Sequence, residues 1–267
     1  MLFNEMLIRD IDACRPRPGE CAFWWLGQMG FIFKTATLTL YFDPFLSDHP
    51  DRLFPSPLRA ELVSNADLVL GTHDHLDHID GDAWQAIAAA SPKARFVLPA
   101  GLKGEVSARL GIPGERLVGA AEGDVIEAAG ATIEAVATAH ELLNDRRENM
   151  AFCVRADGVT LLHLGDTCLY DGFEAKLRAL GPVDALMLPI NGRDARRLRR
   201  NCIGNMTWQE AVDLAGALRP RLTLPGHYDM MEGNTENPAR FAAYLELKYP
   251  DRDFWLGPHA RRAMITK

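Results

Sequence analysis

The sequence has few cysteines, and none of them are paired at metal-binding spacing. Its 267 residues include five cysteines, and no two of them form a CxxC pair. An odd number without such a pair argues against a disulfide framework and against a cysteine-ligated zinc site. Reduced thiols of this kind are typical of cytosolic proteins.

Long apolar runs and an excess of positive charge are also absent. No stretch reaches the roughly 18 apolar residues that a membrane span needs, and Asn4, Glu5 and Arg9 interrupt the N-terminus before a secretory pattern can form. The net charge of −7 argues against a nucleic-acid binder that relies on overall charge. We therefore predict a soluble, cytoplasmic protein with neither a membrane nor a nucleic acid as its partner.

Residues 73–78, with the sequence HDHLDH, are the most informative segment. They bring together four ligand-type side chains: His73, His75, Asp77 and His78. Given the composition, this spacing would arise by chance in about one chain in a thousand of this length. Imidazole and carboxylate groups suit Zn, Mn and Fe. A loop of solvated histidines is the alternative, and the spacing disfavours it.

The direction of these side chains predicts two neighbouring ion positions. His73 and His75 point the same way from an extended segment. Asp77 and His78 follow the start of a turn and can face a second ion. The segment lies between a predicted strand and a predicted helix, on a loop of the kind that often holds catalytic groups.

Hydrophobic periodicity predicts one α/β domain over residues 1–267, with two sheets packed together and helices outside. The predicted strands are 21–26, 30–34, 37–43, 67–71, 95–98, 125–128, 132–138, 150–156, 160–165, 184–188, 221–224 and 254–256. The predicted helices are 82–90, 101–110, 172–180, 207–218 and 237–248. The strand order does not follow from the pattern.

Three further ligand-type residues each come just after a predicted strand. They are His140, Asp166 and His227. Sheet ends are where α/β proteins present their sites. Any one of the three alone is more often a cap or a turn residue, but together with residues 73–78 they favour one metal site.

The remaining histidines lack this setting. His49, His163 and His259 do not follow a strand in the same way. His163 alternates with apolar neighbours and would face away from Asp166 in a regular strand. We interpret these three as structural or solvated.

The order of these residues resembles the metallo-β-lactamase-fold hydrolases over nearly the whole chain. The resemblance implies a four-layer αβ/βα sandwich of two mixed β-sheets with helices outside, holding one or two divalent ions, Mn²⁺ or Zn²⁺, at one edge. By resemblance, the implied ligands of the first ion are His73, His75 and His140. Those of the second ion are Asp77, His78 and His227, Asp166 bridges the two ions, and Asp43 orients the ligand loop from behind.

A narrower resemblance points to the UlaG-like branch, whose named member is L-ascorbate-6-phosphate lactonase, a cytoplasmic manganese enzyme. The similar segments are 25–31, 188–194, 226–230 and 233–238, although this chain is shorter than that lactonase. Related diiron oxygen-reducing proteins carry Glu at the position of His75. The histidine therefore favours a hydrolytic site.

The implied chemistry assigns roles to further residues. Two ions can share a water and lower its pKa, and Asp77 or Asp166 is the predicted catalytic group that guides the proton. Arg193 is the predicted binder of an anionic substrate group, because guanidinium pairs with phosphate or carboxylate through two hydrogen bonds. Asn191, two positions before it, is the second predicted substrate-binding residue, because its amide could donate or accept a hydrogen bond beside Arg193.

The basic segment after Arg193 has a less specific interpretation. Its other arginines are expected on a solvated helix face or at a subunit contact, which leaves a homo-oligomer open. They are Arg196, Arg197, Arg199 and Arg200.

The leading function is a metal-dependent hydrolase of a small anionic substrate, with a sugar-phosphate lactone as the candidate. A metal-dependent phosphodiesterase or nuclease on the same fold is the second reading, and the acidic net charge of −7 counts against it. A non-catalytic metal-binding protein is the third. The complete ligand set argues against it, because a relaxed site would have lost ligands.

Overall fold

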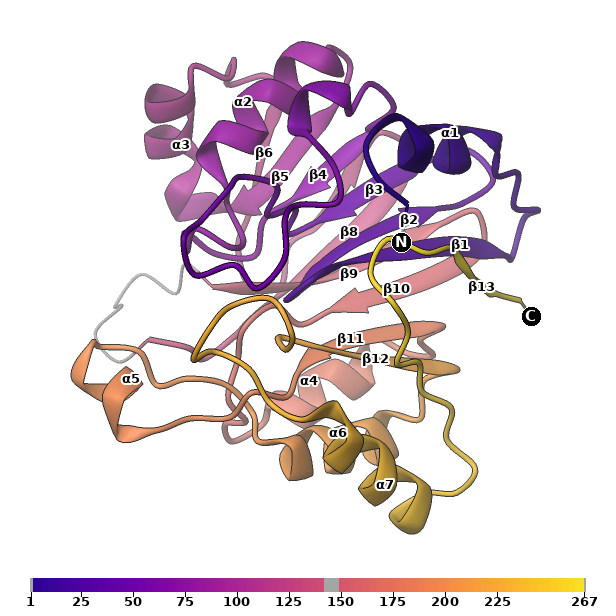
Figure 1. Ribbon diagram of the computed structural model, residues 1–267, viewed down its shortest axis with the longest axis vertical. Helices are drawn as coiled ribbons and strands as arrows, with labels where there is room; N and C mark the ends of the chain where they lie inside the picture. The colour runs from indigo at the N-terminus through magenta and orange to yellow at the C-terminus, as the bar shows by residue number, and fades with distance from the viewer. Residues whose placement is uncertain (1, 142–148, 267) are drawn as a thin grey trace.

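Two β-sheets pack face to face, with helices on both outer faces (Figure 1). The computed structural model describes residues 2–141 and 149–266. Both sheets contain parallel and antiparallel neighbours. The predicted four-layer αβ/βα sandwich of two mixed sheets, the metallo-β-lactamase fold, is therefore confirmed.

The first sheet has seven strands in the order β13-β1-β2-β3-β4-β5-β6. Neighbouring strands are antiparallel along the part β13-β1-β2-β3 and parallel along the part β3-β4-β5-β6. The strands are β1 (Cys21–Gly27), β2 (Gly30–Lys34), β3 (Thr39–Phe42), β4 (Leu68–Leu70), β5 (Arg95–Pro99), β6 (Leu117–Ala120) and β13 (Ala263–Ile265).

The second sheet has six strands in the order β12-β11-β10-β9-β8-β7. Its parallel part comprises β10, β11 and β12. The strands are β7 (Val125–Ala128), β8 (Ala131–Ala137), β9 (Met150–Ala156), β10 (Val159–His163), β11 (Ala185–Pro189) and β12 (Leu222–Gly226).

Helices cover the outer face of each sheet (Figure 1). On the first sheet lie α1 (Glu5–Ala13), α2 (Gly81–Ala90) and α3 (Lys103–Leu110), with the short 3₁₀ helices η1 (Ala60–Leu62) and η2 (Ala100–Leu102). On the second lie α4 (Phe173–Ala179), α6 (Trp208–Leu218) and α7 (Pro238–Lys248), while α5 (Ala195–Arg199) projects at the rim. Within the described ranges, every helix is too short or too polar to span a bilayer.

Strand β1 shows how the layers are held together. Its residues are all buried, as expected for a strand covered on both faces. Phe23 and Trp25 belong to the core between the sheets, whereas Trp24 belongs to the core under the helices of the first sheet. The indole of Trp24 donates to Asp10 Oδ2 of α1 at 2.9 Å, which fixes that helix on the sheet.

The segment 254–256 is not a strand, so this prediction is wrong. Phe254 makes one isolated bridge to Thr223, and the last strand is β13. Trp255 turns instead onto Trp25, with the ring centroids 6.4 Å apart, and Pro258 has no N–H with which to extend a ladder.

Other elements also differ from the prediction. Strand β3 begins at residue 39, because the Thr37 N–H is taken by Asp157 Oδ2 at 2.7 Å. Helix α3 begins at residue 103, after η2. Strands β6 and β13 and helices α1 and α5 were not predicted. Asn4 at the start of α1 is a residue type that often caps helices, but its side chain makes no cap hydrogen bond here.

The predicted site residues gather at one edge of the sandwich because the strands that precede them end there. The carboxyl ends of β3 and β4 lie side by side, with Phe42 opposite Leu70. In the second sheet, Pro189 at the end of β11 lies opposite Gly226 at the end of β12. The loops that follow these strands therefore meet between the two sheets.

Candidate metal centre

The loop after β4 is held in place by Asp43. Its fully buried carboxylate accepts hydrogen bonds from Thr72 N and Thr72 Oγ1, both at 2.8 Å. The same carboxylate lies 2.6 Å from His78 Nδ1. Asp80 then caps α2 by accepting from Ala83 N at 3.1 Å. These contacts fix the start, middle and end of the loop.

Gly71 allows this loop to pack closely against α2. A Cβ at this position would lie 2.5 Å from Ile79 Cγ1 and 2.7 Å from the Trp84 ring. The close approach therefore requires glycine.

The first group of ligand-type atoms comes from His73, His75 and His140, which could hold one metal ion. His73 Nε2 lies 2.9 Å from His75 Nδ1. His140 Nδ1 donates to the Gly204 carbonyl at 2.8 Å, which leaves its Nε2 free to act as a ligand.

The second group comes from Asp77, His78 and His227. His78 Nε2 and His227 Nε2 each lie 3.6 Å from Asp77 Oδ2. Because Asp43 Oδ2 accepts a hydrogen bond from His78 Nδ1–H, His78 Nε2 is the atom left to face an ion.

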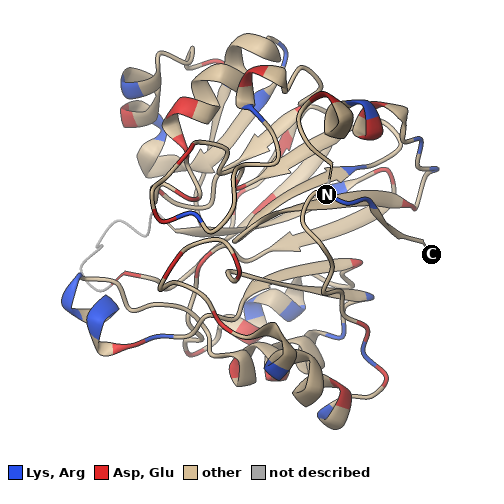
Figure 2. Ribbon diagram, viewed as in Figure 1, with Lys and Arg blue, Asp and Glu red and all other residues tan. Residues whose placement is uncertain are grey.

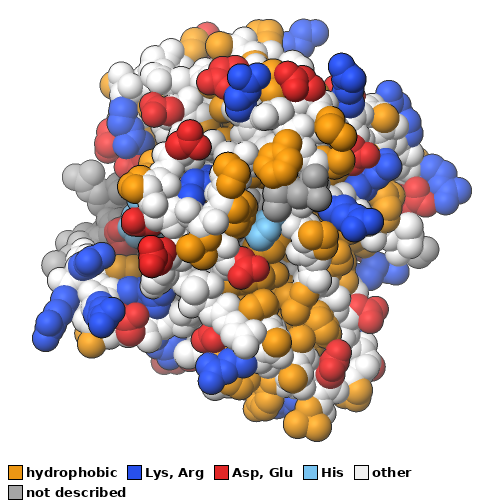
Figure 3. All heavy atoms as spheres, viewed as in Figure 1, with side chains coloured by type: hydrophobic (Ala, Val, Ile, Leu, Met, Phe, Trp, Pro, Cys, Tyr) orange, Lys and Arg blue, Asp and Glu red, His pale blue; other side chains and the backbone are white. Residues whose placement is uncertain are grey.

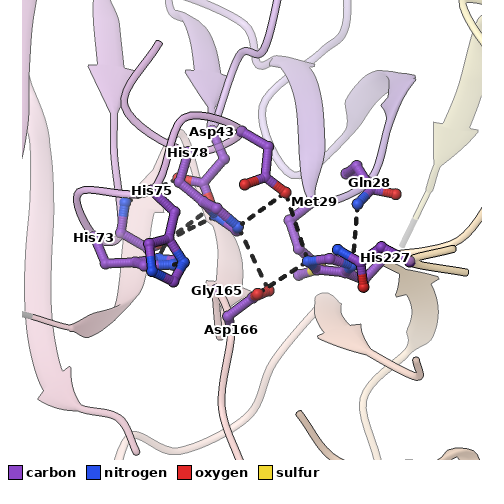
Figure 4. Close-up of polar contacts among 12 residues, drawn as sticks. Gln28, Met29, Asp43, His73, His75, His78, Gly165, Asp166 and His227 are labelled. Atoms are coloured by element: carbon purple, nitrogen blue, oxygen red, sulfur yellow. Dashed lines mark hydrogen bonds and ion pairs between the residues drawn. The ribbon is translucent and has the colours of Figure 1, made fainter. Parts of the chain in front are cut away.

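Asp166 lies between the two groups (Figure 4). Its Oδ2 is 2.9 Å from His227 Nε2 and 3.4 Å from His140 Nε2. Its Oδ1 is 3.5 Å from His78 Nε2. The structure thus brings together all seven predicted ligands, which come from both sheets and from four separate loops.

The donor set fits divalent cations. Within the described ranges, Asp166 Oδ1 and His78 Nε2 are buried and have no hydrogen-bond partner. Buried polar atoms seldom remain unpaired. A metal ion bound among these imidazoles and carboxylates would contact both of these atoms and so satisfy them.

The electrostatics of the centre point the same way. Burial alone would raise the pKa of Asp166, but His227, His78 and His140 outweigh it and hold that pKa well below its usual range. Burial lowers the pKa of His73 well below its usual range, and His78 adds to this effect. Ionised carboxylate and neutral imidazole are the forms that bind metals.

His78 shows that negative charge is in excess at the centre. Burial would lower its pKa, but Asp43, Asp77 and Asp166 outweigh burial and raise the pKa well above its usual range. Three carboxylates close to one buried imidazole therefore favour the presence of a cation.

Most of the chain matches a known protein family. The family model described as the beta-lactamase superfamily domain matches residues 39–228, which contain every ligand-type residue described above. The chain belongs to this superfamily. It is a superfamily member with His and Asp groups that could bind metal ions.

Individual relatives carry two kinds of name. A UPF0173 metal-dependent hydrolase of Pyrococcus abyssi is 29% identical over 220 residues, or 81% of this superfamily member and 88% of the relative. Igni18, a metallo hydrolase from Ignicoccus hospitalis, has a TM-score of 0.74 at 21% identity and covers 92% of this chain and 98% of its own. CmlA, a diiron beta-hydroxylase from Streptomyces venezuelae, has a TM-score of 0.72 at 18% identity, and the match covers 95% of this chain and 55% of CmlA. Because one fold carries both chemistries, the function must be argued from the site.

A cavity of about 490 Å³ opens over the centre. Its floor includes His75, Asp77, His140, Asp166 and His227. Three amides line it as well: Asn191, Asn205 and Asn234. One wall of the cavity is basic and contains Arg196, Arg197 and Arg200. Outside the floor, the cavity is also lined by the acidic residues Asp51, Asp194 and Glu232.

Of the two predicted substrate-binding residues, Asn191 lines this cavity. Its Nδ2 donates to Asn234 Oδ1 at 2.8 Å, and its Oδ1 accepts from Asn205 Nδ2 at 2.8 Å. Arg193 instead forms two hydrogen bonds with the carboxylate of Glu210, at 2.6 and 2.7 Å. Its guanidinium therefore already has an anionic partner at the start of α6.

Several contacts behind the ligands were not predicted. Glu141 Oε1 lies 3.1 Å from His75 Nε2, and Gln28 Nε2 lies 3.1 Å from His227 Nδ1. The available signals were indirect. Glu141 directly follows His140, and Gln28 lies in the segment 25–31 that carries the narrower resemblance.

The other histidines have structural surroundings. Buried His163 donates from Nε2 to Met29 O at 2.8 Å and accepts at Nδ1 from Gly165 N at 3.1 Å, so it is a neutral imidazole. His259 stacks on Trp25, with the ring centroids 4.1 Å apart. His49 Nδ1 accepts from Asp51 N at 3.2 Å.

Proposed function

We propose that this protein is a metal-dependent hydrolase of a small anionic substrate, with a sugar-phosphate lactone of the UlaG-like type as the candidate. The observation that carries the proposal is a pair of buried atoms, Asp166 Oδ1 and His78 Nε2, that have no hydrogen-bond partner within the described ranges. Asp166 is also part of the floor of the cavity. Membership of the beta-lactamase superfamily supports it.

One or two divalent ions, Mn²⁺ or Zn²⁺, would polarise the substrate carbonyl and lower the pKa of the attacking water. In this proposal His73, His75 and His140 hold the first ion. Asp77, His78 and His227 hold the second, and Asp166 serves both.

The two carboxylates at the centre have different surroundings. Asp166 is 4% exposed and is in contact with three imidazoles, which suits a ligand shared between two positions. The Asp77 side chain is 19% exposed and also lines the cavity. We therefore favour Asp77 as the group that receives the proton of the attacking water, with Asp166 as the second candidate.

The basic wall supports an anionic substrate. Helix α5 is a concentrated basic segment (Figure 2). Arg196 of α5 and Arg200, which directly follows it, line the cavity. Arg197 anchors the wall by donating to Gly192 O at 3.0 Å and to Asn234 Oδ1 at 2.7 Å. We therefore assign the anion contact to Arg196 and Arg200, in place of Arg193.

The experiment combines metal analysis with substrate assays. Purified protein under metal-replete conditions is expected to contain divalent ions, and a panel of sugar-phosphate lactones is expected to contain a substrate. Asp166→Ala and His75→Ala should each abolish turnover while circular dichroism shows an intact fold.

Three results would contradict the proposal. Absence of bound divalent ions would favour a non-catalytic protein. Turnover of bis(p-nitrophenyl) phosphate alone would favour the phosphodiesterase reading. The surface charge does not support that reading, because acidic and basic side chains are interspersed on the face shown in Figure 3. Wild-type rates in both variants would remove the assigned centre.

A further inference from the structure

We propose that Gln28 is a positioning residue for His227, and that its amide can accept the Nδ1 proton of His227 when His227 Nε2 holds a metal ion. The inference rests on the proposed metal-dependent function. It concerns a side chain that is fully buried and lies outside the predicted ligand set.

The backbone at Gln28 is fastened to the loop that carries His227. Gln28 lies between β1 and β2 with a φ of 45°. Its carbonyl accepts from Trp25 Nε1 and from His227 N, both at 3.0 Å. A Cβ at Gly226 would lie 2.8 Å from this carbonyl, so the close approach depends on glycine.

His227 itself needs this support. It has a backbone φ of 62°, in the left-handed region that residues other than glycine rarely adopt. Such a conformation persists when surrounding contacts over-determine it. The backbone and side-chain contacts with Gln28 provide two such constraints.

The side-chain amide of Gln28 can pair with either tautomer of His227. Its Nε2 lies 3.1 Å from His227 Nδ1 (Figure 4). Its Oε1 is buried and has no hydrogen-bond partner in the described part of the chain. Because a carboxamide has a donor and an acceptor of nearly the same size and position, a half-turn of the amide presents Oε1 to His227 instead.

The two orientations correspond to two states of the centre. When His227 Nε2–H donates to Asp166 Oδ2, 2.9 Å away, Nδ1 accepts from the Gln28 amide nitrogen. When Nε2 is a metal ligand, the proton resides on Nδ1 and needs an acceptor, which Oε1 supplies. Gln28 can therefore satisfy His227 before and after metal binding.

Two other ligand-type histidines have a partner that only accepts. His78 faces the Asp43 carboxylate at 2.6 Å, and His140 faces the Gly204 carbonyl at 2.8 Å. Both contacts fix the ligand tautomer permanently. His227 differs because its partner is a neutral amide with both functions.

The test uses Gln28→Met, which keeps the length but loses the hydrogen bond, and Gln28→Glu, which keeps an acceptor. Equilibrium dialysis with Zn²⁺ and with Mn²⁺ measures stoichiometry and affinity. We expect two ions in the wild type. In Gln28→Met we expect a loss of roughly 10–100-fold in affinity for one ion, while the other is unchanged. Gln28→Glu should restore the wild-type affinity.

Thr35→Val is the matched control. Thr35 is also fully buried in a turn of the first sheet, but its hydroxyl lies 2.7 Å from Asp157 Oδ2, away from the centre. The control should bind both ions as the wild type does.

The possible outcomes separate this inference from the proposed function. If the wild type binds no ion, both fail. If it binds ions and Gln28→Met binds them equally well, only the role of Gln28 is overturned. Three other results would show that Gln28 has only a structural role and would also overturn its positioning role. They are an equal loss of affinity for both ions in Gln28→Met, weaker metal binding in Thr35→Val, and failure of Gln28→Glu to restore the wild-type affinity.

Discussion

At the scale of single residues, Asp43 links the fold to the chemistry. One fully buried carboxylate holds the backbone and hydroxyl of Thr72 and the imidazole of His78. A buried charge is tolerated when it is paired and hydrogen-bonded in this way. Its removal should therefore affect stability and metal binding together.

Asp43→Ala is expected to destabilise the metal-free protein by about 3 kcal/mol, because it leaves His78 and Thr72 without their partner. It should also weaken divalent-ion binding by roughly 10–100-fold. Urea unfolding in chelator and equilibrium dialysis measure the two effects. Unchanged metal affinity would show that Asp43 supports the loop but does not orient a ligand.

His259 should make stability depend on pH. Burial and nearby Arg52 lower the pKa of this stacked imidazole to about 4. The folded state keeps it neutral while the unfolded chain takes up a proton near pH 6.5. Its contribution is therefore present above about pH 6.5 and is lost as pH falls towards 4, by up to roughly 3 kcal/mol.

The measurement compares the wild type with His259→Phe, which keeps a ring between Trp25 and Phe54. The difference in their unfolding free energies should change between pH 7 and pH 4.5, in favour of the phenylalanine variant at low pH. Parallel pH profiles would contradict the assignment.

Residue-scale prediction was best where chemistry and strand position coincide. His140, Asp166 and His227 could be picked out because each is a ligand-type residue just past an apolar strand. The contact of Gln28 with His227 joins residues 199 positions apart, and local patterns carry no information on it. Arg193 was assigned to substrate because the sequence does not show that Glu210 binds it.

At the scale of elements, periodicity identified most strands but missed short or weakly marked ones. Strand β6 has only four residues and includes Gly119, so it lacks a clear apolar alternation. Helix α5 has five residues, of which none are buried, so no apolar stripe reveals it. The cap of α5 comes from Asp194, which accepts from Arg196 N at 2.7 Å and from Arg197 N at 3.0 Å.

The position of Arg200, directly after helix α5, leads to a prediction about substrate binding. Arg200→Glu should raise KM for anionic substrates by roughly tenfold, because a charge-assisted contact of about 1.5 kcal/mol becomes repulsive, while kcat changes little. Arg199→Glu is the control, since this neighbour lies on the same short segment and is not among the residues that line the cavity. Equal KM values for the two variants would remove the basic wall from substrate binding.

At the scale of the whole molecule, the centre joins the two sheets. Residues 43 and 72–78 follow strands of the first sheet, whereas His140, Asp166 and His227 follow strands of the second. Ions held between these loops would bind the folded state and not the unfolded chain, and such binding stabilises a protein by mass action.

Removal of metal should therefore lower the stability of the entire sandwich. With free ion at about 100 times Kd, the loaded protein should be more stable than the chelated one by about 2.7 kcal/mol. For a chain of this size that corresponds to a fall in Tm of several degrees, on the order of 5–10 °C. Calorimetry with and without chelator measures it, and identical Tm values would show that ions do not connect the two sheets.

The distribution of ligands along the chain also has a consequence for biosynthesis. Asp43 follows β3, and His227 follows β12, which comes last in the sequence among the strands of the second sheet. A nascent chain on the ribosome cannot assemble the complete centre until His227 has emerged. Full loading with metal must then come after translation of β12 and His227, so a chain cut short before β12 would be released without a complete binding site.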